Sequence, residues 1–311
     1  MSFIEIVGGN TLDGELDVQG SKNAVLPILA ATVLVKGICK INHCPKIRDV
    51  KYMLKILEQL GCKTWWDEHT VYVDSSYMKA ISVPDEFVSG MRSSIILLGS
   101  LLGRMRHVVI AYPGGCSIGK RPIDFHLTSF RLMNVQVDEK DNHIYCSTEQ
   151  LKGTDIHLKF PSVGATENII LAAVLAKGTT RIYNAAREPE IEQLCNFLNQ
   201  AGARIIGGST GWIKIDGVDT LNPVEYTVAA DRIVAGTYMT MVAATGGEAT
   251  FKGIDPEHVL SLIHVLTDMG CDILKGENSI HLSSNGQLKA HDLLITRPYP
   301  GFPTDMQAQM M

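Results

Sequence analysis

One repeated pattern constrains the fold of this 311-residue chain more than any other feature. In each copy a polar turn precedes an apolar helix-like stretch, a glycine and a short β-like run follow, and a second, amphipathic helix ends at another glycine. The two glycines lie 23 or 24 residues apart in three copies, as Gly37–Gly61, Gly178–Gly202 and Gly247–Gly270. Units with two helices and several strands predict an α/β fold built from repeats.

The copies begin near Ser21, Met91, Ala165 and Ala230. One such unit cannot enclose a core alone, and a chain of this length is long for a single core. We therefore expect a complete domain of three units over residues 22–229. Residues 1–21 together with 230–311 are expected to form part of a second domain.

The second copy carries an insertion. Its two turn positions, Gly103 and Asn134, are 31 residues apart, and the extra residues include "PGGCSIGK". Insertions on the exposed face of a repeat often serve function. Cys116 lies there among glycines, close to Lys120 and Arg121, and nearby cations lower a thiol pKa. The pattern favours a nucleophile or an acid/base group, and an incidental surface thiol is the alternative.

The helix starts of the copies are polar. They carry Lys22 and Asn23, then Arg92, then Glu167 and Asn168, then Asp231 and Arg232. Free backbone N–H groups make helix N-termini good anion sites, whereas ordinary N-capping is the simpler reading. Lys22 and Arg92 oppose the helix dipole, which indicates another role. If the helix starts share one point, that point is a cleft for a phosphorylated ligand.

Other polar residues fit two readings each. In "RPIDFH", Asp124 suits a helix cap, and His126 is more typical of a packed or solvent-facing histidine than of a base. The stretch "PSVGATEN" (161–168) is a turn entering a helix, which suits anion or hydroxyl contacts or a plain loop. Asp305, between Pro303 and the chain end, suits a cap or a general base.

Composition excludes several classes of protein. The net charge of -5 argues against a nucleic-acid or membrane-surface partner, and no apolar run reaches the ~18 residues of a spanning helix. The start "MSFIEIVGGN" lacks the basic region of a signal peptide. Seven cysteines without a CxxC pair favour free thiols in a reducing compartment over disulfides or a metal site. We expect a cytoplasmic protein.

The motifs resemble those of the UDP-N-acetylglucosamine 1-carboxyvinyltransferase family over essentially the whole chain. The resemblance rests on "SKNAVLPIL", "PGGCSIGKRPIDFHL", "SVGATENI", "NAAREPEIE", "ADRIVAGTYM" and "FPTDMQAQ". It implies the inside-out α/β barrel of enolpyruvyl transferases, with two domains built from βαβαββ units. The related phosphoshikimate enzyme shares that fold but is not similar in the cysteine loop.

The resemblance also implies a reaction. The 3-hydroxyl of UDP-N-acetylglucosamine attacks C2 of phosphoenolpyruvate, C3 is protonated, and phosphate leaves, in the first committed step of peptidoglycan synthesis. By position, Cys116 is the loop acid or nucleophile, alkylated by fosfomycin in this family, Asp305 is the base, and Lys22 holds phosphoenolpyruvate. No cofactor and no metal are implied. The implied substrate-binding residues are Lys22, Asn23, Arg92, Arg121, Pro122, Ile123, Asp124, Phe125, Ser162, Val163, Gly164 and Asp305.

Relatives in this family continue well past "FPTDMQAQ", so we expect an incomplete second domain with uncovered apolar faces. Three interpretations stay open. The chain is an active transferase, an inactive form that binds UDP-N-acetylglucosamine without turnover, or a fragment completed by a second chain. Self-association through the uncovered second domain would fit the last.

Overall fold

The computed structural model describes residues 3, 5, 7–83, 85, 88, 91–112 and 123–311. The chain divides into two compact units. Unit 1 comprises Met1–Ser21 and Ala229–Met311, and unit 2 comprises Lys22–Val228. Unit 2 is therefore inserted in the sequence of unit 1, and each unit has its own hydrophobic core.

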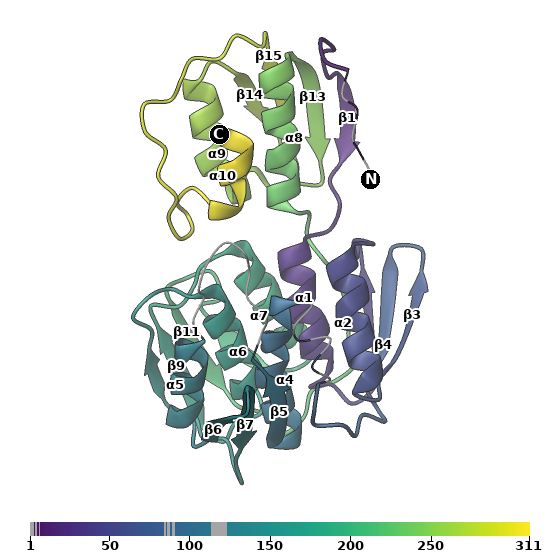
Figure 1. Ribbon diagram of the computed structural model, residues 1–311, viewed down its shortest axis with the longest axis vertical. Coiled ribbons are helices and arrows are strands. Elements are labelled where there is room, and N and C mark those ends of the chain that lie inside the picture. Colours follow the sequence, from purple (N-terminus) through teal and green to yellow (C-terminus); the bar gives the residue numbers. More distant parts are fainter. Residues whose placement is uncertain are drawn as a thin grey trace. The chain divides into compact units, whose positions relative to one another are not determined.

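Unit 2 holds three sheets and the helices that pack against them (Figure 1). The strand orders are β12-β2-β4-β3, β5-β7-β6 and β10-β11-β9-β8. Its helices are α1 (Lys22–Thr32), α2 (Arg48–Gln59), η1 (Arg92–Ile96), α4 (Leu97–Met105), α5 (Asp124–Leu132), α6 (Val163–Ala173) and α7 (Pro189–Gln200). Its strands are β2 (Ile38–Asn42), β3 (Lys63–Asp67), β4 (Thr70–Asp74), β5 (His107–Ala111), β6 (Gln136–Lys140), β7 (His143–Ser147), β8 (Asp155–His157), β9 (Thr179–Tyr183), β10 (Arg204–Ile206), β11 (Trp212–Asp216) and β12 (Glu225–Thr227).

The third copy shows the repeat in full. Along the chain it runs β8, α6, β9, α7, β10 and β11, which is a βαβαββ order. β8 pairs with β9 in parallel, with Ile156 opposite Ile182, and β11 pairs antiparallel with both β9 and β10. The crossover helix α6 joins the parallel strands, as such a connection requires. The α/β fold built from repeats is thus confirmed.

The other copies in unit 2 keep this plan with a different first strand. In the first copy β12, from the far end of the unit, pairs in parallel with β2, with Tyr226 opposite Ile41. In the second copy the first strand is reduced to a single parallel bridge between Ser82 and Val109. The first strand thus comes from a different part of the chain in different copies: β8 lies directly before its copy, whereas β12 follows the third copy in sequence.

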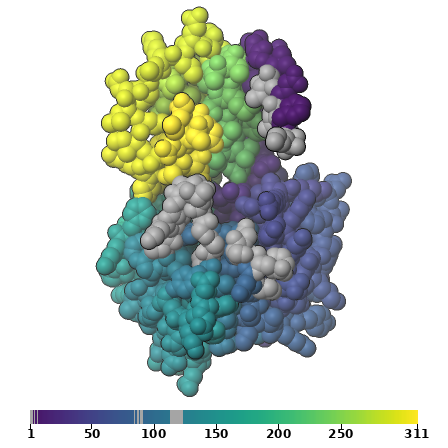
Figure 2. All heavy atoms as spheres, viewed as in Figure 1, coloured from purple at the N-terminus to yellow at the C-terminus, as the bar shows by residue number. Residues whose placement is uncertain are grey.

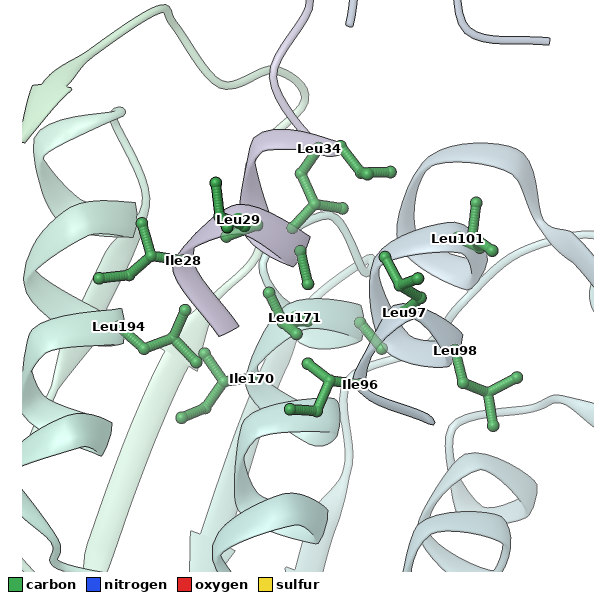
Figure 3. Close-up of a cluster of buried hydrophobic side chains, with 14 of the residues drawn as sticks. Ile28, Leu29, Leu34, Ile96, Leu97, Leu98, Leu101, Ile170, Leu171 and Leu194 are labelled. Atoms are coloured by element: carbon green, nitrogen blue, oxygen red, sulfur yellow. The ribbon is translucent and has the colours of Figure 1, made fainter. Parts of the chain in front are cut away.

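The first helix of each copy forms the centre of unit 2. Residues 24–32 of α1, 97–103 of α4 and 165–173 of α6 are all buried, whereas the strands alternate between buried and more exposed residues. Ile28, Leu97 and Leu171 meet there with aliphatic side chains from the neighbouring helices (Figure 3). Full burial of one such side chain contributes roughly 1.5–3 kcal/mol, so this helical centre contributes substantially to the stability of the unit.

The second helix of each copy ends in the left-handed conformation that the sequence predicts. Gly61, Gly202 and Gly270 each follow the C-cap residue of their helix, with φ of 96°, 104° and 108°. In the second copy Asn134 occupies this place with φ of 70°, and asparagine tolerates that region better than most residues.

Unit 1 contains one repeat and further C-terminal elements. Its sheet has the order β1-β13-β15-β14, in which β1 pairs in parallel with β13. The C-terminal residues, in yellow, lie against α8, in green (Figure 2). Its elements are β1 (Gly14–Asp17), α8 (Arg232–Thr245), β13 (Gly247–Lys252), η2 (Pro256–Val259), α9 (Leu260–Asp268), β14 (Asp272–Lys275), β15 (Ser279–Ser284), η3 (Thr304–Met306) and α10 (Gln307–Met310).

α8 differs from its counterparts in unit 2 because it exposes apolar side chains. Val234 is half-buried, Tyr238 is 39% exposed and Met241 is 44% exposed, and this spacing places all three on one face of the helix. With 14 residues, α8 is the longest helix in the described part of the chain, and none there is long and apolar enough to span a bilayer.

Candidate active site

Polar residues stand at the helix starts of unit 2. Lys22 opens α1, Arg92 opens η1 and Asp124 opens α5, and Ser162 is the N-cap of α6. The predicted polar starts are confirmed at α1 and η1, and also at α8 in unit 1, where Asp231 caps the helix and accepts from two backbone N–H groups.

Lys22 and Asn23 occupy the first turn of α1. The Lys22 side chain is 46% exposed, and its Nζ lies 3.8 Å from Oδ2 of Asp49 in the first turn of α2. An exposed ion pair of this length contributes little to stability. Asn23 is half-buried beside it. Lys22 is therefore a half-exposed cation at a helix start whose ion pair with Asp49 adds little to stability.

His126 lies in the first turn of α5 and is only 6% exposed, as expected of a packed histidine. Its pKa is lowered from 6.5 to about 4, chiefly by burial and then by the positive charge of Arg92, whereas Asp124 acts in the opposite direction. The ring is therefore neutral at physiological pH. Arg92 at the start of η1 therefore lies close enough to influence the charge of the ring at the start of α5.

The start of α6 has backbone N–H groups that make no hydrogen bond to the described residues. The Ser162 side chain accepts from the Ala165 N–H at 3.4 Å, and its carbonyl accepts from the Thr166 N–H at 2.9 Å. The N–H groups of Val163 and Gly164 have no partner among the described residues. A Cβ on Gly164 would lie 3.2 Å from Cε1 of His126, so the imidazole edge borders these two donors.

Asn168 joins three helices. Its Oδ1 accepts from the Gly99 N–H of α4 at 2.7 Å, and its Nδ2 donates to the Ile95 carbonyl at 3.1 Å and to Nδ1 of His126 at 2.8 Å. Its side chain is completely buried. This residue holds the starts of η1, α5 and α6 in fixed relation to one another.

The prediction that Glu167 and Asn168 form a helix start is wrong by about one turn, because α6 begins at Val163. Glu167 is 3% exposed. Burial raises its pKa well above the usual range, and the nearby carboxylates of Glu190 and Glu188 raise it further. Glu167 is therefore a core residue whose burial favours the neutral acid, and it supplies no positive charge that would attract an anion.

The remaining predicted residues fall in three places. Ile123 is 7% exposed just before α5, and Phe125 is half-buried in its first turn. Asp305 belongs to unit 1, where it is exposed in η3. Cys116, Arg121 and Pro122 lie outside the described residues. Six other cysteines are buried free thiols, and burial raises the pKa of Cys44, for example, to about 12.

Sequence reasoning missed the contact between Asn168 and His126. The available signal was an asparagine directly before the apolar run "IILAAVLA". A buried amide in such a helix needs hydrogen-bond partners, so this asparagine predicts a contact with another element. Among the described residues, no group of three or more histidine, cysteine or acidic side chains is placed to hold a metal ion.

Unit 2 has cations and open backbone donors at the starts of several helices, an arrangement suited to binding an anion. Comparison with known proteins gives the chain a family. The model of the EPSP synthase (3-phosphoshikimate 1-carboxyvinyltransferase) family matches residues 6–311. This chain belongs to the EPSP synthase family. Within the family it is 48% identical to UDP-N-acetylglucosamine 1-carboxyvinyltransferase 2 of Caldanaerobacter subterraneus subsp. tengcongensis, covering 100% of this chain and 75% of that protein.

A second relative of this EPSP synthase family member bears the same enzyme name. UDP-N-acetylglucosamine 1-carboxyvinyltransferase 1 of Staphylococcus aureus is 45% identical, with 100% of this chain and 75% of that protein covered. Among solved structures, the enolpyruvyl transferase NikO of Streptomyces tendae superposes with a TM-score of 0.79 at 19% identity, covering 89% of this chain and 67% of that one. EPSP synthase of Acinetobacter baumannii gives 0.68 at 21% identity, covering 92% and 68%. These two likenesses show the fold.

Proposed function

We propose that this protein transfers the enolpyruvyl group of phosphoenolpyruvate to the 3-hydroxyl of UDP-N-acetylglucosamine and releases phosphate. This is the first committed step of peptidoglycan synthesis. The observation that carries the proposal is the 44–48% identity, over essentially the whole chain, to proteins that bear this enzyme's name. The open donors and cations at the helix starts of unit 2 suit two substrates that both carry phosphate.

Each predicted residue has a role in this reaction. The sugar hydroxyl loses its proton to Asp305 while its oxygen bonds to C2 of phosphoenolpyruvate, and C3 takes a proton from Cys116. The tetrahedral intermediate then expels phosphate with formation of the enol ether. Cations stabilise the phosphate and carboxylate throughout, and Lys22, Arg92 and Arg121 supply them. Asn23 contacts substrate and intermediate.

The nucleotide sugar lies along the starts of α5 and α6. Val163 and Gly164 present backbone donors there beside Ser162, and we assign residues 121–125 to the same substrate. We assign the anion-binding helix starts to a domain over residues 22–229. Residues 1–21 with 230–311 form the second domain, which carries Asp305. Six buried free thiols fit a reducing compartment, and we place the reaction in the cytoplasm.

Phosphate release tests the proposal. The full chain is incubated with phosphoenolpyruvate and either UDP-N-acetylglucosamine or shikimate 3-phosphate. We expect phosphate release only with the nucleotide sugar, together with an enolpyruvyl product by mass spectrometry. Cys116→Ala should bind the nucleotide sugar without turnover. Release that depends on shikimate 3-phosphate, or none at high enzyme concentration, would contradict the proposal. Calorimetric binding without turnover in the wild type would indicate an inactive binding form.

We also propose that unit 1 self-associates through the apolar face of α8 formed by Val234, Tyr238 and Met241. An apolar helix face left partly in water favours association. A pocket of about 370 Å³ at the C-terminal end of this unit is lined largely by apolar side chains, among them Leu294, Phe302 and Met310. Both features are typical of a surface that contacts another chain.

A further inference from the structure

The side chain of Asn168 is inserted into the first helix of the second copy. In an uninterrupted α-helix the N–H of residue 99 donates to the carbonyl of residue 95. Here the Gly99 N–H donates to Oδ1 of Asn168 at 2.7 Å, and Nδ2 of Asn168 donates to the Ile95 carbonyl at 3.1 Å. An N–H only donates and a carbonyl only accepts, so the two contacts fix the orientation of the amide. The amide therefore bridges two backbone groups that a continuous helix would join to each other.

The helix changes its form at this bridge. Residues Arg92–Ile96 form the 3₁₀ helix η1, and the α-helix α4 begins at Leu97. In the described part of the chain, the first helices of the other copies, α1, α6 and α8, begin directly as α-helices. A 3₁₀ turn at a helix end is common, but here the inserted amide gives it a physical cause. The amide occupies the two groups whose bond would extend α4 back toward Arg92.

The form of η1 decides where Arg92 lies. A 3₁₀ helix turns by ~120° and rises by ~2.0 Å per residue, whereas an α-helix turns by ~100° and rises by ~1.5 Å. Over the four steps from Ile96 back to Arg92, the two forms differ by about 80° in direction and about 2 Å along the axis. In the 3₁₀ form, the charge of Arg92 lies close enough to the buried ring of His126 to disfavour its protonation.

The amide of Asn168 has little freedom to move. The residue is completely buried, and its Nδ2 also lies 2.8 Å from Nδ1 of His126. Its oxygen and its nitrogen thus all have partners, and a fully bonded buried amide is held in one orientation. Packing alone does not require an amide at this position, because without it the Gly99 N–H and the Ile95 carbonyl can bond to each other.

We propose that Asn168 is a positioning residue for Arg92, because it holds η1 in the 3₁₀ form that sets the place of the guanidinium in the site. The inference rests on the proposed function, in which Arg92 stabilises the phosphate or carboxylate of phosphoenolpyruvate. Without the amide, η1 relaxes into an extension of α4 and Arg92 turns away. Asn168 is completely buried, so it acts through Arg92 and not by touching the substrate.

A double-mutant cycle tests this proposal. At saturating UDP-N-acetylglucosamine, phosphate release gives kcat/KM for phosphoenolpyruvate in the wild type, Arg92→Ala, Asn168→Ala and the double variant. We expect Arg92→Ala to lower this value about ten- to hundredfold, as for a lost hydrogen bond to a charged group, and Asn168→Ala to lower it about tenfold. Because Asn168 acts through Arg92, the double variant should stay within about twofold of Arg92→Ala. Losses that multiply in the double variant would overturn the proposal.

Asn199 is the matched control. Its amide likewise joins a backbone N–H and a backbone carbonyl, which here both belong to Ile205 and lie at 2.8 Å each. Asn199→Ala should lower the melting temperature and leave kcat/KM within about twofold of the wild type, since it removes two bonds of the same kind away from η1. Asn168→Ala should lower both quantities. An unchanged kcat/KM in Asn168→Ala would overturn the inference.

A second variant covers the case in which Asn168→Ala does not fold. Asn168→Asp keeps the size of the side chain and the acceptor for the Gly99 N–H, but it loses the donor to the Ile95 carbonyl. The same cycle with Arg92→Ala then applies to it. We again expect a lower kcat/KM for phosphoenolpyruvate in the single variant and no further loss in the double variant.

A measurement on the wild type needs no variant. Scalar couplings across hydrogen bonds connect a backbone nitrogen to the carbon that carries its acceptor oxygen. The Gly99 nitrogen should couple to Cγ of Asn168, and coupling to the Ile95 carbonyl carbon instead would overturn the proposal. A wild type without any turnover would refute the proposed function, and this inference with it, whereas multiplying losses in an active enzyme would refute the inference alone.

Discussion

The backbone N–H of Gly99 in α4 donates to Oδ1 of Asn168 in α6 at 2.7 Å, and a Cβ on residue 99 would lie 2.3 Å from the Asn168 carbonyl oxygen. The two helices approach so closely that only a glycine fits. One buried side chain thereby fixes the spacing of two helices and the orientation of His126. Packing and site geometry depend on the same contact.

Gly99→Ala tests this approach. The added methyl group would overlap the backbone of α6, which cannot move without disturbing the core, so we expect a loss of about 1–3 kcal/mol or more in the free energy of unfolding. Denaturant unfolding measures it. Ser100→Ala is the control, because Ser100 Oγ is buried without a hydrogen-bond partner among the described residues and its removal should be neutral or stabilising. An equal effect of both changes would contradict the close approach.

His126 makes stability depend on pH in the acid range. Its pKa is about 4 in the folded state against an ordinary 6.5, so the unfolded chain takes up the proton first as the pH falls. Its contribution, of the order of 3 kcal/mol, is complete above pH 6.5 and is lost as the pH falls towards 4. The difference in stability between the wild type and His126→Gln should be constant above pH 6.5 and should change as the pH falls from 6.5 to 4, because only the wild type takes up this proton on unfolding. Parallel curves would count against a buried neutral ring.

Glu167 gives stability the opposite dependence on pH. Its pKa is raised in the folded state, so its contribution is present below the unfolded value of 4.5 and is lost as the pH rises through the folded pKa. Glu167→Gln keeps the neutral shape, and we expect it to be more stable than the wild type at high pH and equal to it near pH 4. Glu149→Gln, at an exposed position of the same unit, should show no such trend. Thermal melts across the pH range provide the measurement.

Lys22 should matter for activity more than for stability. We expect Lys22→Ala to lower kcat/KM for phosphoenolpyruvate by ten- to hundredfold, because a charged hydrogen bond to the substrate is lost. The melting temperature should hardly change, since the pair with Asp49 is exposed. Asp49→Asn removes the partner of Lys22. Because an exposed ion pair contributes little, turnover should stay within about twofold of the wild type. A similar loss in both variants would assign Lys22 a structural role.

The exposed face of α8 gives a prediction about assembly. Met241→Glu places a charge among apolar side chains at an exposed position, so we expect less self-association in sedimentation experiments and little change in folding. Thr245→Glu, exposed at the end of the same helix, is the control. A wild type that is monomeric at all concentrations would refute the proposed contact.

Local patterns in the sequence predict the repeated helices and their left-handed ends, because glycine spacing and hydrophobic periodicity are properties of neighbouring residues. Gly61, Gly202, Gly270 and Asn134 all have the expected conformation. The stop glycines of the first helices are less uniform. Gly246 follows α8 directly, whereas Gly37 lies five residues beyond the end of α1, after a further turn.

Tertiary contacts account for what the patterns could not predict. Glu167 looks like a polar helix start in sequence, but packing of α6 against α7 buries it beside Glu190. The pairing of β12 with β2 joins Glu225 to Lys40, and such distant partners leave no trace in local periodicity. The roles of Asn168 and His126 likewise depend on three helices meeting, which only the fold determines.

The placement of β1 has a consequence for the order in which the protein is made. Gly14 pairs opposite Ala249, and the N–H of Ser21 donates to the carbonyl of Ala229 at 2.9 Å, so the whole of unit 2 emerges from the ribosome between two neighbouring strands. Unit 2 has all its strands once residue 228 is synthesised, whereas β1 must wait, unpaired, for β13. Unit 1, which contains the N-terminus of the chain, therefore completes its sheet after unit 2 has all of its strands.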